Sequence, residues 1–230
     1  MKHLKTRVSG VALVGLALAA ATVDAAMVSY TNKTAYDAAT AAFVAKQTEN
    51  FDGIPVNTAF ASGTGPSPLS FTYSIPGYSL SVGNGFPTTS NDNFLGLNNP
   101  DMAFYLGDSF TINFGRTVNA VGLYLVAGDD AIAGELQLSV SGASVLNSGT
   151  PFVISPGNNA FFLGLVESDP ALGFAGATIR GIAPTDAPGA FLAFTADDIT
   201  SANAIPEPAT WALMLAGLGA LSAGIVVWKR

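Results

Sequence analysis

Apolar and polar residues alternate in several short stretches of the middle of the chain. Ser, Thr, Gln or Asn separates the apolar positions in the four clearest stretches, which are Leu69-Phe71-Tyr73, Tyr78-Leu80-Val82, Phe110-Ile112-Phe114 and Leu136-Leu138-Val140. A period of two is typical of half-buried β-strands. Further strands are predicted at Met102–Leu106, Val118–Val126, Pro151–Ile154, Ala160–Val166, Ala177–Ile182 and Phe191–Ala196. Turn residues separate these runs, so the pattern predicts a mainly β fold, an antiparallel, jelly-roll-like β-sandwich.

One short helix is predicted before the strands. Thr34 and Asp37 have the spacing of a capping box, and an alanine-rich stretch with helical spacing follows from Ala35 to about Lys46. After Glu49 the pattern becomes β, and the Gly-, Pro-, Ser- and Thr-rich segment 53–67 is predicted to be a long surface loop.

The first 25 residues are typical of a secretory signal peptide. Lys2, Lys5 and Arg7 precede an apolar core from residue 11 to 21, and Val23-Asp24-Ala25 offers a small-residue cleavage site. Signal peptidase is therefore an expected partner. One β-sandwich domain is expected at residues 26–204.

The last 26 residues combine a polar motif, an apolar run and a basic end. Residues 209–228 carry no charge and are long enough for a single transmembrane helix, with Trp211 and Trp228 near its ends. Lys229-Arg230 is expected to stay in the cytoplasm, which places the preceding domain outside the inner membrane.

Pro206-Glu207-Pro208, the apolar helix and the basic end together resemble the PEP-CTERM sorting signal of Gram-negative bacteria. The resemblance covers residues 205–230 and implies recognition by an exosortase. The protein would then be anchored transiently in the inner membrane, with its body in the periplasm, before reaching the cell surface or extracellular matrix. The alternative is a plain C-terminal anchor that follows a proline-rich turn.

Composition narrows the chemistry of the body. Residues 26–205 contain four basic and fourteen acidic residues, a net charge of −10, so nucleic acid is not an expected partner. The one histidine, His3, lies in the signal peptide and the chain has no cysteine. These absences exclude Ser-His and Cys-His nucleophilic sites and zinc bound by those residues. A cation that binds oxygen ligands, such as calcium, is still compatible with this composition.

Four acidic residues form the first candidate site. Glu49 and Asp52 stand at the start of the β region, and Asp197 and Asp198 stand near its end. Terminal strands of a jelly roll often lie side by side, so these carboxylates could bind one structural calcium ion. Alternatively, Asp52 and Asp197 cap turns. Asp129-Asp130, after Gly128, is interpreted as a hairpin turn.

A second candidate site is a ligand-binding loop. Asn91 and Asp92 could hydrogen-bond sugar hydroxyls, with Phe94 or Tyr105 as a stacking platform. The alternative is an ordinary solvated loop.

Two functions follow from these patterns. The body also resembles lectin-like sandwiches in four short segments, which are Glu49-Asn50-Phe51-Asp52-Gly53, Val121-Gly122-Leu123-Tyr124, Phe161-Phe162-Leu163-Gly164 and Phe191-Leu192-Ala193-Phe194-Thr195-Ala196-Asp197-Asp198-Ile199. The chain has no Gly-x-Ser-x-Gly, no Ser-x-x-Lys and no phosphate-binding glycine loop followed by lysine. Two carboxylates could in principle hydrolyse a glycoside, but no pair stands out in the sequence, so an enzyme is not expected. The first hypothesis is an exported surface or matrix protein associated with exopolysaccharide and biofilm. The alternative is a carbohydrate-binding module, with calcium as a stabilising ion.

Overall fold

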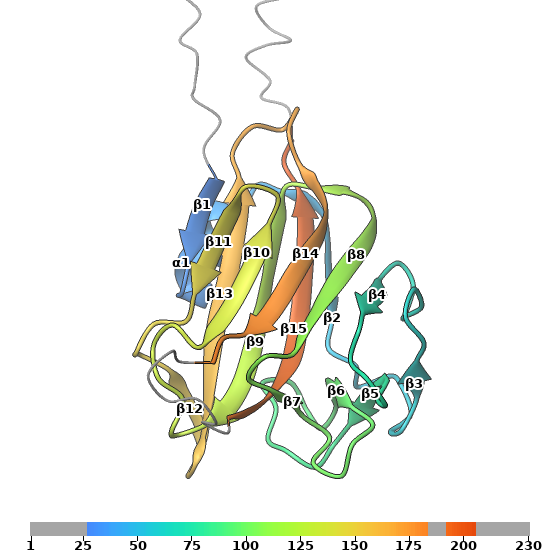
Figure 1. Ribbon diagram of the computed structural model, residues 1–230. Helices are drawn as coiled ribbons and strands as arrows, with labels where there is room; N and C mark the ends of the chain where they lie inside the picture. The colour runs from blue at the N-terminus through green and yellow to red at the C-terminus, as the bar shows by residue number, and fades with distance from the viewer. Residues whose placement is uncertain (1–26, 184–191, 206–230) are drawn as a thin grey trace, which may run out of the picture.

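A computed structural model describes residues 27–183 and 192–205 of the 230-residue chain. Two antiparallel sheets face each other, and one short helix lies outside the larger sheet (Figure 1). This arrangement confirms the predicted β-sandwich. The elements are β1 (Met27–Tyr30), α1 (Lys33–Ala39), β2 (Val44–Glu49), β3 (Ala59–Phe60), β4 (Ser70–Tyr73), β5 (Leu80–Gly83), β6 (Phe94–Leu97), β7 (Phe104–Tyr105), β8 (Ser109–Val118), β9 (Ala120–Gly128), β10 (Leu136–Val140), β11 (Ala143–Leu146), β12 (Phe152–Ser155), β13 (Asn158–Glu167), β14 (Phe174–Gly181) and β15 (Ala193–Asn203).

The larger sheet is built around the long strand β15. Its order is β1-β13-β9-β15-β6-β5-β3, while β12 pairs with β13, and β2 and β7 pair with β15. The smaller sheet has the order β11-β10-β14-β8-β4. Because β9 leads into β10, and β13 into β14, the chain crosses repeatedly between the sheets and joins them in one domain.

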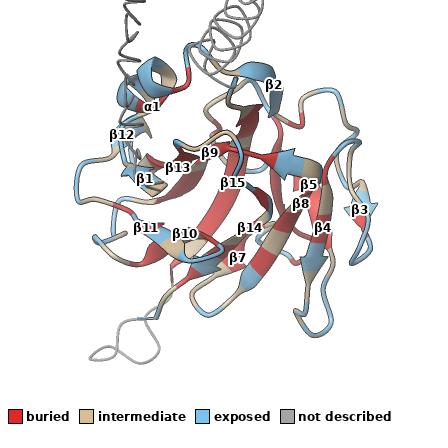
Figure 2. Cartoon of the chain, turned by 90° about the horizontal axis from the view of Figure 1, so that it is seen from above, coloured by how far each residue is buried: buried red, intermediate tan, exposed pale blue. Residues whose placement is uncertain are grey.

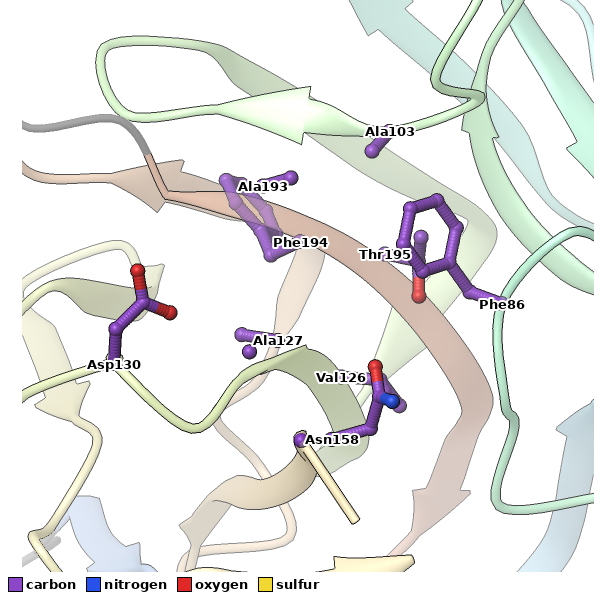
Figure 3. A pocket seen from close by; sticks show the side chains of 11 residues that line it. Phe86, Ala103, Val126, Ala127, Asp130, Asn158, Ala193, Phe194 and Thr195 are labelled. Atoms are coloured by element: carbon purple, nitrogen blue, oxygen red, sulfur yellow. The ribbon is translucent and has the colours of Figure 1, made fainter. Parts of the chain in front are cut away.

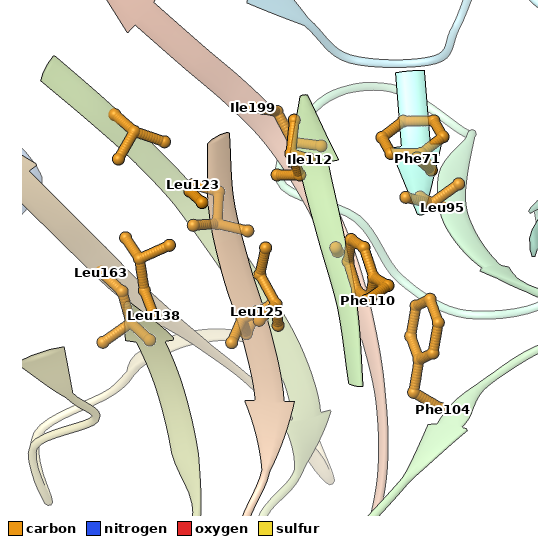
Figure 4. Packing of buried hydrophobic residues seen from close by; sticks show 14 of the residues in the cluster. Phe71, Leu95, Phe104, Phe110, Ile112, Leu123, Leu125, Leu138, Leu163 and Ile199 are labelled. Atoms are coloured by element: carbon orange, nitrogen blue, oxygen red, sulfur yellow. The ribbon is translucent and has the colours of Figure 1, made fainter. Parts of the chain in front are cut away.

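The core fills the space between the sheets, where the buried strand faces meet (Figure 2). Every second residue is buried in β10 and in the Phe110–Phe114 part of β8, as the alternation predicts. At one end of the core Phe104 stacks on Phe110 and on Phe194, with ring centroids 4.7 and 5.3 Å apart. Aliphatic side chains such as Leu138 and Leu163 fill the other part (Figure 4).

The helix is shorter than predicted and begins at another cap. Asn32, rather than Thr34, is the N-cap, and its side-chain oxygen accepts a hydrogen bond from the N–H of Ala35 at 3.0 Å. The helix ends at Ala39, whereas the sequence predicted about Lys46. Residues 44–49 instead form β2, because pairing with β15 outweighs the weak helix preference of an alanine-rich segment.

The helix packs on the outer face of the larger sheet through Tyr36. This buried ring lies over Gly122 of β9 and Gly164 of β13, which are directly paired. A Cβ at either glycine would come within 3.0 Å of a Tyr36 ring carbon. The absence of side chains at this pair therefore makes room for the ring, and Phe162 packs against it at 5.2 Å.

The first and last strands reach the same end of the sandwich. Val28 of β1 pairs with Val166, Val166 pairs with Ala120, and Ala120 pairs with Ala202 near the end of β15. We call this the terminal end, and the opposite end, with Gly128 and Asn158, the far end. They are about 25 Å apart along β9.

Three predicted features fall on residues that the structure does not describe. These are the signal peptide at residues 1–25, the sorting motif Pro206-Glu207-Pro208 and the transmembrane helix at residues 209–228. Across residues 27–183 and 192–205, no helix has the length and apolar character needed to cross a membrane.

We expect Gly164→Ala to lower the free energy of unfolding by about 1–3 kcal/mol, because the new methyl group would lie 2.7 Å from a Tyr36 ring carbon. Urea unfolding of residues 26–205 measures this change. Gly53→Ala is the matched control, since a Cβ there meets no atom within 4 Å. Equal stability of the two variants would contradict the proposed packing of Tyr36.

Candidate functional site

A β-bulge in β15 sets the geometry of the acidic residues. Asp197 pairs with Tyr124 and Thr200 with Gly122, so β15 has one more residue than β9 in this interval. Asp198 occupies the extra position with φ of 51°, a conformation that Asp tolerates better than most residues. The bulge lets Asp197 face outward while Ile199, two residues later, enters the core.

The Asp197 carboxylate is fully buried beneath the loop between β5 and β6. Its Oδ2 accepts hydrogen bonds from the backbone N–H groups of Thr89 and Ser90 at 2.9 and 3.0 Å. Its Oδ1 accepts one from the N–H of Asp198 at 2.8 Å. Burial raises the pKa of Asp197 and the charge of Asp198 raises it further, while these donors act in the opposite direction. Asp197 thus attaches the loop to the central strand.

Asp52 holds the next part of the same loop. Its Oδ1 accepts hydrogen bonds from the backbone N–H groups of Asp92 and Asn93, both at 3.2 Å, and Oδ2 accepts one from the Asn91 side chain at 3.3 Å. Burial tends to raise the pKa of Asp52, but the donors from Asp92, Asn93 and Asn91 lower it below the usual value. Two carboxylates distant in sequence therefore order one loop.

Glu49 lies close to these groups but does not bind the loop. It pairs with Ile199 at the junction of β2 and β15, and its Oε1 accepts a hydrogen bond from the N–H of Phe51 at 2.7 Å. The expected pairing of early and late strands is therefore present. In the part of the chain that the structure describes, no three acidic residues gather as a group able to hold a metal ion. A calcium ion at Glu49, Asp52, Asp197 and Asp198 stays a prediction.

The structure corrects part of the predicted ligand-binding loop. Phe94 is fully buried and packs edge-on against Phe86 at 6.0 Å, so it has no exposed face on which a ligand could stack. Tyr105 is half-buried and donates a hydrogen bond to the carboxylate of Asp101. Burial and the bond to Asp101 raise the pKa of Tyr105 to about 12. Asn91 and Asp92 are exposed, and their N–H groups are used by Asp52.

Asp129-Asp130 forms a turn, as interpreted from the sequence, with the N–H of Ala131 bonded to the carbonyl of Gly128 at 3.3 Å. The turn is not a hairpin, because it leads from β9 in the larger sheet to β10 in the smaller one.

A hollow that the sequence did not predict opens beside this turn at the far end. Its volume is about 270 Å³, and it lies on the outer face of β9 and β15. Phe86 borders it beside Thr195, and Asn158 and Asp130 lie across from them (Figure 3). We call it the far-end hollow. Its residues come from separate turns and strands, and only the alternation around Thr195 could have indicated that this side chain faces outward.

A second hollow of about 300 Å³ lies nearer the helix. Tyr124, Phe152 and Phe162 contribute aromatic side chains, and Asn32 and Lys33 contribute polar ones. Phe152 is 66% exposed. We call this the helix-side hollow. The outer face of the larger sheet therefore carries two concave surfaces with aromatic and polar lining.

Comparison with known proteins identifies the end of the chain. Residues 204–230 match the PEP-CTERM protein-sorting motif. The chain therefore carries a PEP-CTERM sorting signal, which implies an exported protein that passes through the membrane and is processed by an exosortase. A comparison with curated proteins finds no match for the chain.

We expect Asp197→Asn to destabilise the protein by about 2–3 kcal/mol, because an amide group would turn N–H donors toward the donors of Thr89 and Ser90. Asp129→Asn is the control, since Asp129 is exposed in a turn and should change stability by less than about 0.5 kcal/mol. Urea unfolding compares the two. An Asp197→Asn variant with the same free energy of unfolding as the wild type would show that the carboxylate does not hold the loop.

The lowered pKa of Asp52 predicts a specific pH dependence. Its ionised form stabilises the folded state above the unfolded pKa of about 3.9, and this contribution is lost as the pH falls through the lower folded pKa. The stability difference between wild type and Asp52→Asn should therefore be present at pH 6 and disappear near pH 2. A difference that is constant across this range would contradict the assignment.

The calcium prediction has its own measurement. If Glu49, Asp52, Asp197 and Asp198 bind calcium, the melting temperature of residues 26–205 should rise with calcium and fall with a chelator. If neither calcium nor the chelator changes the melting temperature, the predicted calcium site is rejected.

Proposed function

We propose that this protein is displayed at the cell surface or released into the extracellular matrix, where its β-sandwich is associated with exopolysaccharide and biofilm. Signal peptidase removes residues 1–25, and the helix at residues 209–228 anchors the chain in the inner membrane with the body in the periplasm. Exosortase then acts at Pro206-Glu207-Pro208. The role is one of display, without catalysis.

The observation that carries this proposal is the position at which the last described strand ends. The last strand, β15, ends at Asn203, and the sorting motif begins at residue 204. Among the described residues, the last contacts are made by Asn203, whose side chain donates to the Thr117 carbonyl at 2.9 Å, and by the N–H of Ala204, which donates to Asn119 at 3.1 Å. Cleavage after this point would leave every described strand intact.

The arrangement of the two ends supports the same function. Both end strands reach the terminal end, so an anchor following β15 would hold this end toward the membrane and present the far end outward. The far-end hollow favours the alternative function, a carbohydrate-binding module, because its mixed aromatic and polar lining suits sugars.

We expect Glu207→Gln to keep the chain in the inner membrane with an intact C-terminus, whereas wild type loses both ends and leaves the membrane. Intact-mass analysis of the membrane and secreted fractions measures this, in hosts with and without the exosortase. Asp129→Asn, a similar loss of one carboxylate in an exposed turn, is the control and should behave as wild type. Wild-type protein found only in the inner membrane with its full C-terminus would overturn the proposed sorting.

A further inference from the structure

The far-end hollow contains a buried hydroxyl group without a partner. Thr195 is 2% exposed, and its Oγ1 makes no hydrogen bond with any group of residues 27–183 and 192–205. Thr195 faces outward from β15, because its neighbours Phe194 and Ala196 belong to the core between the sheets. A buried hydroxyl with no partner is unfavourable, so a group entering the hollow can gain a hydrogen bond that the folded chain does not supply.

The surroundings of Thr195 combine one apolar and two polar features. The half-buried ring of Phe86 stands beside it, held by edge-on contact with the buried Phe94. Across the hollow lie the amide of Asn158 and the carboxylate of Asp130. A sugar ring has an apolar C–H face and hydroxyl groups at its edge, so it matches an aromatic ring with hydrogen-bonding groups around it.

The charge of the lining selects among small ligands. None of the described residues that line the hollow is Lys, Arg or His, and Asp130 supplies a negative charge at its edge. The body as a whole has a net charge of −10. Phosphates, carboxylates and uronic acids would therefore meet repulsion without a compensating cation, whereas neutral hydroxyl groups can donate to Asp130 and Asn158.

We propose that the far-end hollow binds one neutral sugar residue, with its C–H face against Phe86 and one of its hydroxyl groups bonded to Thr195. A volume of about 270 Å³ limits the site to a single ring. The proposal rests on the proposed function for its biological setting, because the far end would point away from the membrane toward exopolysaccharide. The binding itself does not depend on sorting.

The test uses the purified full-length chain in a zwitterionic detergent without a sugar headgroup, which could itself compete for the hollow. Binding of the methyl glycosides of glucose, galactose, mannose and N-acetylglucosamine is titrated by saturation-transfer NMR, with glucuronate as the acidic comparator. We expect saturable binding of at least one neutral glycoside, and binding of glucuronate at least about tenfold weaker.

Three variants locate the site. Thr195→Val keeps the shape and removes the hydroxyl, so it should weaken sugar binding about tenfold while leaving the melting temperature equal or higher. Phe86→Leu should also weaken binding by removing the aromatic face. Phe152→Leu removes the exposed ring of the helix-side hollow and is the matched control, which should bind as wild type.

Several results would overturn the proposal. They are absence of saturable binding by all four neutral glycosides, unchanged binding by Thr195→Val, loss of binding in Phe152→Leu alone, or glucuronate binding as tight as that of the neutral sugars. A Thr195→Val variant that binds no less sugar but melts lower would indicate that a bound water is the partner of the hydroxyl. Failure of sorting is a separate outcome, because it is measured by intact mass in cells.

Discussion

The burial of the Asp197 carboxylate is the constraint on which the far half of the molecule depends. A charged group with no exposed surface must receive hydrogen bonds, and here they come from the β5–β6 loop and from the bulge at Asp198. The same bulge lets Ile199 enter the core two residues after Asp197 faces outward. Strand pairing, core packing and the shape of the outer surface are thus coupled within three residues of β15.

The outer face of the larger sheet is divided by two covering elements. Near the terminal end, α1 places Tyr36 over the glycine pair of β9 and β13. Near the far end, the loop held by Asp197 and Asp52 covers β15 and carries Phe86 to the edge of the far-end hollow. Between and beside these covers the sheet stays open, which is why the two hollows lie on this face and not between the sheets.

Much of the fold could be predicted from the sequence where residues alternate strictly. β10 and the Phe110–Phe114 part of β8 bury every second residue, so a period of two identifies them. β6 was missed because all four of its residues are buried and show no alternation. β2 was missed because its residues are mostly exposed and follow a helix-forming segment, so only their pairing with β15 makes them a strand. Phe94 was placed wrongly at a surface, since an aromatic residue beside polar ones looks the same in sequence whether it faces the core or solvent.

The sequence by itself determined that this protein is exported and which class of fold it adopts. The sorting motif at residues 204–230 is a continuous segment, and alternation is a local property, so both can be read without knowing what lies nearby in space. Only the tertiary structure decided what the acidic residues contact and where a ligand could enter. Asp52 and Asp197 bind the same loop, and Phe86, Asp130, Asn158 and Thr195 border one hollow. The contact between Thr89 and Asp197 joins residues 108 positions apart, and strand pairing, which no local pattern encodes, brings them together.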